Sequence, residues 1–264
     1  MTIAGATQAV VVTGASSGIG EALARAWARR GATLVLSARD EAGLARVARA
    51  VDAAGGRAVV VPADLTLEQD RVRLVQRARA EAGKIDVLVN NAGRGFYGSV
   101  ARIDPIELQA LFALNVVAPL RLAQLALDPL TRSGGAVVMM SSVAGVVASP
   151  RMGAYAATKF ALEAISMSLR AELAGTGVRV IVVRPGPVDT AFREHAVTTD
   201  GRAGVRPRGA QVQSPDDVAD QTLRAVDRGQ PVVETTTFVR LASAAARIAP
   251  FAVRWVSAAM AARN

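Results

Sequence analysis

Six short runs of apolar residues recur along this chain, and a segment with helical periodicity follows each run. The runs cover residues 9–13, 33–37, 58–61, 87–89, 136–140 and 179–183, and the helical segments cover residues 19–30, 41–54, 67–82, 105–127, 153–175 and 215–228. The runs are apolar at nearly every position, which is typical of parallel strands covered on both faces. The alternation therefore predicts an α/β fold, a doubly wound parallel sheet of about seven strands flanked by helices on both faces.

Length and composition indicate a single domain over residues 1–264, because a chain of 264 residues with 51% hydrophobic content can bury a full core. Residues 189–213 break the regular alternation and show little apolar periodicity. They are rich in Gly, Pro, Thr and Arg, so we interpret them as a long loop or substrate lid.

The pattern of residues 238–264 predicts an amphipathic helical extension at the C-terminus. Arg240, Arg247 and Arg254 are seven residues apart and share one helical stripe, opposite a face of Leu, Ile, Phe and Val. Pro250 should kink or split this helix. Three interpretations stay open: packing on the chain's own domain, a lid over an apolar substrate, and peripheral contact with a membrane surface.

The composition argues against several kinds of site and partner. The chain has no cysteine, which excludes disulfides and thiolate metal ligands and fits a cytoplasmic location, and its one histidine, His195, argues against a histidine-rich metal site. The net charge of +9 comes from 29 arginines scattered along the chain, so we expect no nucleic-acid partner. We also expect neither an export signal nor a run long enough to cross a bilayer.

A glycine-rich turn joins the first predicted strand to the first predicted helix. Its glycines are Gly14, Gly18 and Gly20, with Ser16, Ser17 and Ile19 between them. Such a turn brings backbone close to a pyrophosphate, and the helix N-terminus supplies free N–H groups, so the turn predicts a Rossmann-like dinucleotide site. Residues 14–18 also match the Gly-x-Ser-x-Gly pattern of a hydrolase, with Ser16 as nucleophile and His195 as base, and this alternative stays open.

Tyr155 and Lys159 stand four residues apart in a predicted helix, so their side chains share one face. An isolated phenol has a pKa of about 10, so a tyrosine exchanges a proton at neutral pH only when a cation stabilises its phenolate. Lys159 is placed to lower the pKa of Tyr155, and the pair predicts proton transfer by the tyrosine.

Together these motifs resemble the short-chain dehydrogenase/reductase family over about residues 8–235. The resemblance also rests on Asn90-Asn91-Ala92-Gly93 after the fourth strand, Asn115 in a long helix, Ser141-Ser142 after the fifth strand, and Pro185-Gly186 followed by Thr190. It implies that Tyr155 is the general acid and base, that Ser142 donates to the substrate oxygen, and that Asn115 bends its helix and holds a water beside Lys159. It also implies that Lys159 binds the nicotinamide ribose.

The resemblance further implies a nicotinamide coenzyme and the residues that bind it. Besides the glycine turn, Tyr155 and Lys159, the expected coenzyme residues are Arg39, Asp64, Leu65, Asn91, Ala92, Gly93, Pro185, Gly186, Val188 and Thr190. Ala38 stands where NAD-preferring members carry Asp, and the Arg39 guanidinium suits a phosphate, so NADP(H) is favoured.

These observations predict an NADP(H)-dependent oxidoreductase that interconverts a carbonyl (ketone or aldehyde) and an alcohol, on a small apolar substrate. The alternatives are a non-catalytic NADP(H)-binding regulatory protein and the Ser16/His195 hydrolase. The resemblance implies a homodimer or homotetramer formed through the long helices around Asn115 and Tyr155.

Overall fold

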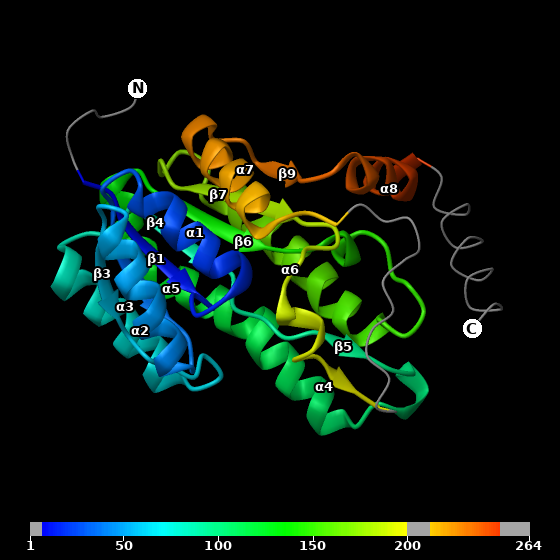
Figure 1. The fold of residues 1–264 in the computed structure, drawn as a ribbon. Helices are drawn as coiled ribbons and strands as arrows, with labels where there is room; N and C mark the ends of the chain where they lie inside the picture. Colours follow the sequence, from blue (N-terminus) through cyan, green and yellow to red (C-terminus); the bar gives the residue numbers. More distant parts are fainter. Residues whose placement is uncertain (1–6, 200–211, 249–264) are drawn as a thin grey trace.

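A computed structural model of the chain describes residues 7–199 and 212–248, and its centre is a parallel sheet of seven strands (Figure 1). In sheet order the strands are β3 (Arg57–Val60), β2 (Thr33–Ser37), β1 (Ala9–Thr13), β4 (Val87–Asn90), β6 (Ala136–Met140), β7 (Arg179–Arg184) and β9 (Val232–Glu234). The chain runs outward from β1 to β3 and then returns to β4 on the other side of β1. This reversal creates a crevice between the carboxyl ends of β1 and β4, where ligands bind in such sheets.

Helices cover both faces of the sheet (Figure 1). One face carries α1 (Gly18–Ala28), α2 (Glu41–Ala53) and α7 (Pro215–Arg228), and the other carries α3 (Glu68–Ala82), α5 (Ala118–Ser133) and α6 (Gly153–Glu172). Successive strand residues point to opposite faces, so Val10 and Val12 enter the core under α1 while Val11 enters the core under α5. The predicted Rossmann-like fold, with its doubly wound parallel sheet and helices on both faces, is confirmed.

The strand predictions from apolar runs agree closely with the structure. β1, β2 and β6 have the expected bounds, β4 and β7 each end one residue later than expected, and β3 begins and ends one residue earlier. The seventh strand, β9, did not stand out as a separate run because only three residues take part, Val232–Glu234.

The expected helix over residues 105–127 is divided in the structure. α4 (Pro105–Phe112) passes into a π-helical segment, η2 (Ala113–Val117), and then into α5, which continues through Pro129 to Ser133. A π segment widens one turn and often occurs at a functional site. Here the widened turn contains Asn115.

This divided helix also bears on membrane crossing. Within the described chain, residues 105–133 form a stretch long and apolar enough to span a bilayer by length and composition alone, and an 18-residue window within it has a mean hydropathy of 1.7. The expectation that the chain has no such run is therefore wrong for this stretch. In the fold, Leu122, Ala126 and Leu130 of α5 are buried against the sheet, as in the core helix of a globular protein.

The segment expected to be a loop has some regular structure. Its described part, residues 189–199 and 212–213, contains the short helix η4 (Ala191–Arg193) and the strand β8 (Val197–Thr198). β8 pairs in parallel with β5 (Phe96–Tyr97), which follows β4. This small second sheet brings residues after β4 and residues after β7 together beside α4 (Figure 1).

The described part of the C-terminal extension is α8 (Thr237–Ile248). Val239 and Ser243 are buried, whereas Phe238, Leu241 and Ile248 are exposed. The helix therefore packs with a narrow face and leaves much apolar surface uncovered. Pro250 and Arg254, which carried part of the sequence interpretation, lie outside the described residues.

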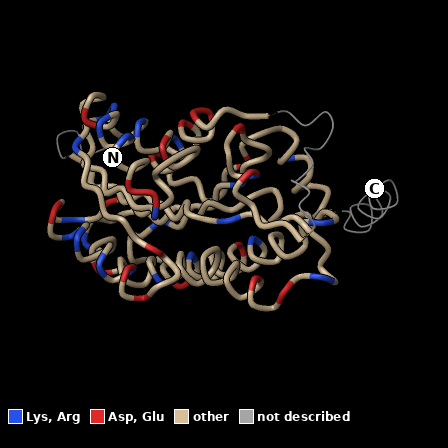
Figure 2. The backbone as a smooth tube through the Cα atoms, turned by 60° about the horizontal axis from the view of Figure 1, so that its bottom comes forward, with Lys and Arg blue, Asp and Glu red and all other residues tan. Residues whose placement is uncertain are grey.

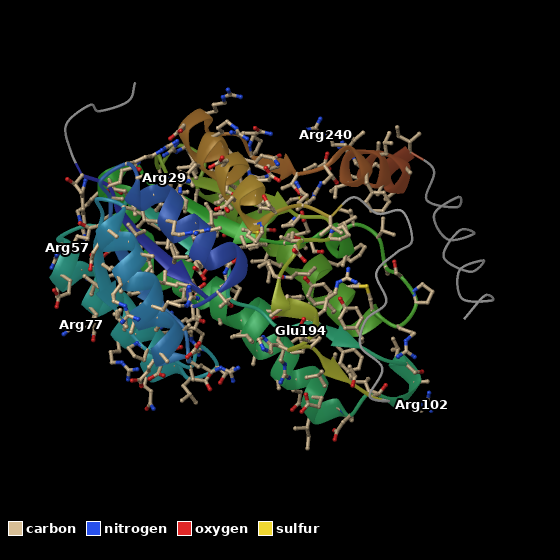
Figure 3. All side chains as sticks on the ribbon, viewed as in Figure 1. Arg29, Arg57, Arg77, Arg102, Glu194 and Arg240 are labelled. Carbon is tan, nitrogen blue, oxygen red and sulfur yellow. The ribbon has the colours of Figure 1, made fainter. Side chains whose placement is uncertain are left out.

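Charged residues of both signs are interspersed over the described chain (Figure 2). Several arginines join neighbouring helices, as in the Arg30–Asp227 pair between α1 and α7 at 3.0 Å. Others, including Arg57, Arg77 and Arg102, lie at the edges of the molecule (Figure 3). The described residues thus match the expectation that charge is scattered along the chain.

Candidate active site

The glycine turn after β1 is closely packed against the turn after β4. Gly14 has a φ of 63°, and a Cβ there would lie 2.9 Å from the Cα of Ala92. A Cβ on Gly20 would overlap the carbonyl oxygen of Gly14. Glycine is therefore required at both positions, because any larger residue would push the turn away from its neighbour.

Asn91 and Thr13 hold the two turns together. The Asn91 amide Nδ2 donates to the carbonyl oxygens of Thr13 and Gly14, at 2.9 and 3.2 Å. The Thr13 hydroxyl accepts from the N–H groups of Asn91 and Ala92, both at 3.0 Å, and donates to Val89 O at 3.1 Å. Sequence reasoning placed Asn91 at the site but missed Thr13, whose role depends on a strand 76 residues away.

The N-terminus of α1 points out of this turn without a side-chain cap. Ser17 occupies the N-cap position and its hydroxyl makes no capping hydrogen bond, so backbone N–H groups around Ser17, Gly18 and Ile19 face outward. Thr190, after β7, lies against Gly18, where an added Cβ would be 3.0 Å from Thr190 Cγ2. A glycine turn that leads into an uncapped helix N-terminus fits the pyrophosphate of a dinucleotide.

The adenosine end of the expected site lies at the ends of β2 and β3. Arg39 is exposed, and it forms no ion pair within the described part of the chain. The pKa of Asp64 is lowered, mainly by a hydrogen bond from the backbone of Thr66 and in smaller part by the nearby Arg39 cation. Leu65, the next residue, is buried, and its carbonyl accepts from Arg71 at 2.6 Å.

Arg46 of α2 is a further cation beside the glycine turn that sequence reasoning missed. Its guanidinium donates to the carbonyl of Ser16 at 2.9 Å and forms a bidentate pair with Glu21 at 2.6 and 2.7 Å. Because Glu21 balances this charge, Arg46 braces the turn, and Arg39 is the more available cation for a phosphate.

Tyr155, Lys159 and Ser142 lie together at the carboxyl end of β6. Tyr155 and Lys159 are buried on one face of α6, and the Lys159 ammonium lies 5.7 Å from the centre of the Tyr155 ring. The Lys159 Nζ donates to the carbonyl of Met140, the last residue of β6, at 2.8 Å. The Ser142 hydroxyl, two residues further on, is hydrogen-bonded to the Tyr155 phenol.

Burial dominates the electrostatics of this pair. It raises the pKa of Tyr155 above its usual value, and the hydrogen bond with Ser142 opposes the rise only in part. Burial likewise lowers the pKa of Lys159 to about 8. The expected lowering of the Tyr155 pKa is therefore wrong for this structure, and the phenol is protonated at neutral pH, which is the form a general acid needs.

Asn115 connects the π segment to this pair. Its Nδ2 donates to Arg94 O at 2.9 Å and to the Thr158 hydroxyl at 3.1 Å, and its Oδ1 accepts from Arg94 N at 2.9 Å. The Thr158 hydroxyl in turn donates to Tyr155 O at 2.7 Å. A Cβ on Gly93 would lie 3.2 Å from Asn115 Oδ1 and 3.8 Å from Lys159 Nζ, so the turn after β4 reaches the same place. The structure thus brings Asn115 beside Lys159, while a water held there stays a prediction.

The remaining expected coenzyme residues lie in the segment after β7. Pro185 O accepts from Val143 N at 3.0 Å, which ties this segment to the turn that contains Ser142. Val188 pairs with Gln213, and a Cβ on Gly186 would lie 3.3 Å from Val239 Cγ2 of α8. α8 therefore packs behind the Pro185-Gly186 turn.

An apolar cluster surrounds the Tyr155 side chain. Its buried members besides Tyr155 are Phe96, Leu111, Ala144, Ala154 and Ala156. The Phe192 ring of η4 lies 5.8 Å from the Tyr155 ring, centre to centre. Phe192 was not singled out from the sequence, because its proximity depends on the pairing of β5 with β8.

The hydrolase arrangement does not form. Within the described residues no hydrogen bond joins Ser16 to His195, and His195 is exposed after η4. The Ser16 carbonyl, just before α1, accepts a hydrogen bond from Arg46. His195 lies in a different segment, two residues after η4. The pattern Gly-x-Ser-x-Gly is explained by the glycine turn alone.

The fold and this site define a class, the nucleotide-binding α/β proteins with a Tyr-x-x-x-Lys pair beside the coenzyme cleft. Residues 8–201 match the family model described as short chain dehydrogenase, and the chain belongs to this family of oxidoreductases, which use a nicotinamide coenzyme. A ketoacyl reductase, HetN, from a Nostoc species is 35% identical over 259 residues, covering 93% of this chain and 88% of that protein.

Solved structures give the same result. A short-chain dehydrogenase from Sphingobium yanoikuyae in complex with NADPH matches with a TM-score of 0.78 and 34% identity, covering 94% of each chain. A short-chain dehydrogenase/reductase from Burkholderia phymatum in complex with NAD matches with a TM-score of 0.83 and 26% identity, covering 94% of this chain and 95% of the other.

Replacing Gly20 by alanine should weaken dinucleotide binding. The new Cβ would overlap Gly14 O and displace the turn, so we expect NADPH to bind at least about tenfold more weakly, measured by fluorescence titration. Gly31→Ala is the control, because no atom lies within 4 Å of its added Cβ, and the backbone strain at its φ of 73° lies away from the dinucleotide turn. Equal weakening in both variants would contradict the packing argument.

An oxidoreductase reaction that depends on the Lys159 cation should slow as the pH rises through about 8, because Lys159 loses its proton there. Its folded-state pKa lies below the usual value, so the cation is present at lower pH and lost above it. The measurement is kcat/KM on both sides of pH 8. Lys159→Arg should remove this alkaline decline at a lower overall rate, and Lys84→Arg should leave it unchanged. A decline that persists in Lys159→Arg has another origin.

Proposed function

We propose that this protein is an NADP(H)-dependent oxidoreductase that interconverts a ketone or aldehyde and an alcohol by hydride transfer, with Tyr155 as the general acid and base. The observation that carries the proposal is the buried phenol of Tyr155, hydrogen-bonded to Ser142 and beside Lys159. When bound, a nicotinamide coenzyme supplies or accepts the hydride.

The chain's own residues manage the substrate oxygen. In reduction, this oxygen gains negative charge as the carbonyl carbon becomes tetrahedral, and Tyr155 Oη donates a proton to it. The Ser142 hydroxyl donates a hydrogen bond to the same oxygen. The Lys159 ammonium stabilises the phenolate that remains, and in the reverse direction that phenolate accepts the alcohol proton. Asn115 holds the Arg94 backbone and the Thr158 hydroxyl in place beside Tyr155 and Lys159 through hydrogen bonds to both.

The preference for NADP(H) rests on the end of β2. Ala38 offers no carboxylate to repel a 2′-phosphate, and Arg39 is exposed without an ion-pair partner in the described chain. Two features support it further: the Sphingobium structure holds NADPH, and the guanidinium fork matches phosphate geometry.

An apolar substrate fits the surroundings of Tyr155. The cluster around its ring is aliphatic and aromatic, and Phe192 covers one side. The similarity to a ketoacyl reductase is consistent with a ketone on an aliphatic chain. On α8, the apolar side chains of Phe238, Leu241 and Ile248 are exposed. They support two alternative roles for the extension, a substrate lid and a peripheral membrane contact.

We further propose that the protein is a cytoplasmic homodimer or homotetramer. Exposed apolar side chains on η2 and α6, namely Val117, Phe160 and Met167, support association through these helices. The absence of cysteine supports a reducing compartment.

Tyr155→Phe should reduce the rate of NADPH oxidation with a ketone panel by about 10²–10⁴-fold, because the proton donor is lost while the ring stays in place. NADPH binding should persist in this variant. His195→Ala is the matched control and should retain activity. Loss of activity in His195→Ala with retention in Tyr155→Phe would refute the mechanism, and no activity in the parent protein on any carbonyl would favour the regulatory alternative.

Arg39→Ala should raise the KM for NADPH by about tenfold or more, because a charge-assisted hydrogen bond contributes about 1.5–3 kcal/mol. The KM for NADH should change little, since that coenzyme lacks the 2′-phosphate. Arg49→Ala provides the control, an exposed arginine further along α2. Equal effects on both coenzymes would contradict the assignment of Arg39.

A further inference from the structure

Glu163 continues the line of Tyr155 and Lys159 along α6, one further turn away from the phenol. Its side chain is nearly as buried as that of Lys159, with 7% and 5% of the residue surface exposed. Burying a carboxylate is costly unless it is paired, and no part of the proposed reaction uses Glu163 directly. Its position therefore requires an explanation.

The partner of Glu163 is Arg184, the last residue of β7. Arg184 Nε donates to Glu163 Oε1 at 2.9 Å and Arg184 Nη2 donates to Oε2 at 2.8 Å, a bidentate pair. The remaining Arg184 Nη1 donates to Glu234 of β9 at 3.0 Å. Arg184 thus serves two carboxylates, and it holds Glu163 in one orientation.

The strand register shows how this pair relates to the catalytic lysine. Met140, whose carbonyl receives the Lys159 ammonium, is paired with Val183, the residue before Arg184. Arg184 is paired with Glu234. α6 therefore carries Lys159 over the end of β6 and Glu163 over the end of β7. Charges alternate from Lys159 through Glu163 and Arg184 to Glu234, and the four balance.

Gly145 keeps Glu163 and Lys159 close to the turn that follows β6. A Cβ on Gly145 would lie 3.1 Å from Glu163 Cγ and 3.2 Å from the Lys159 carbonyl oxygen. The turn containing Ser142 and the buried face of α6 are thus in direct contact, without space for water between them at this point.

Few other charges face Lys159. Among the elements around α6, the strand β6, the segment η2 and the short helix η3 (Val143–Gly145) carry no titratable side chain. β7 contributes Arg179 and Arg184, β5 contributes Tyr97, and the α4 side contributes the Arg94–Glu107 pair at 3.0 Å. α6 itself adds Tyr155, Arg170 and Glu172 to Glu163. Glu163 is the carboxylate whose charge acts on the Lys159 ammonium and opposes the effect of its burial.

We propose that Glu163 is a positioning residue that keeps Lys159 in its ammonium form at neutral pH, and that Arg184 fixes the Glu163 carboxylate for this purpose. The inference deepens the proposed function, on which the role of Lys159 rests. The negative charge of the Glu163 carboxylate favours the protonated lysine, whereas burial of the lysine favours its neutral form.

The chain offers a direct test because it contains only two lysines, Lys84 and Lys159. Protein labelled with ¹³C at lysine Cε gives two signals, and Lys84→Arg assigns them. The pH titration of the Lys159 signal is then followed in the parent protein, in Glu163→Gln and in Glu234→Gln. Glu234→Gln is the matched control, since it removes the other carboxylate from the same arginine. The Lys84 signal reports that each variant is folded.

We expect the Lys159 midpoint to move to lower pH by about one pH unit in Glu163→Gln, the effect of removing one nearby opposite charge. Glu234→Gln should move it much less, and Glu163→Asp should restore most of the parent behaviour. Equal shifts in the two glutamine variants, or no shift in either, would overturn the proposal. A parent protein whose Lys159 is already neutral at pH 7 would also overturn it, even if no variant folds.

Enzyme kinetics give a second readout that separates this inference from the proposed function. The alkaline decline of kcat/KM should move with the Lys159 signal in Glu163→Gln, whereas an overall loss of rate at constant profile would indicate a structural role only and refute the inference. If the signal moves as expected but no carbonyl is reduced by the parent protein, the electrostatic role stands and the proposed reaction fails.

Discussion

The hydrogen bonds between the turn after β1 and the turn after β4 are the contact on which the site depends. The Thr13 hydroxyl accepts from the Asn91 N–H, and the Asn91 side-chain amide donates to the Thr13 carbonyl. This contact lies between β1 and β4, where the strand order of the sheet reverses. Because this contact closes the two turns, Gly14 and Gly20 have room only for hydrogen atoms, and the N-terminus of α1 is aimed into the crevice. The same turn after β4 continues to Gly93 and Arg94, so it also positions Asn115 and the neighbourhood of Lys159.

A second constraint follows from the burial of Tyr155 and Lys159. Burial moves both pKa values toward the neutral forms, the phenol upward and the ammonium downward. The charge of the Glu163 carboxylate opposes the second shift, while the first keeps the phenol protonated at neutral pH. The burial of the pair therefore requires compensation at the lysine.

Much of this could be predicted from the sequence, because the determinants are local. Strands buried on both faces are apolar at every position, the glycine spacing follows from the clearance a turn needs, and a spacing of four places Tyr155 and Lys159 on one helix face. The two-residue strands β5 and β8 could not be predicted, since their pairing joins segments about a hundred residues apart. The π segment at Asn115 and the direction of the Tyr155 pKa likewise depend on contacts and burial that only the folded chain has.

This difference divides the site into two parts with different physical origins. The coenzyme side is made mostly of backbone: N–H groups at a helix end, glycines and turn carbonyls, which a short motif specifies. The substrate side is made of side chains from distant segments, with Phe96, Leu111 and Phe192 meeting around Tyr155. Its shape depends on how β5, η4 and β8 pack. Val239 of α8 also packs against Gly186, behind this part of the site. A motif therefore specifies the coenzyme side of the site, whereas the choice of substrate depends on the packing of segments that no motif covers.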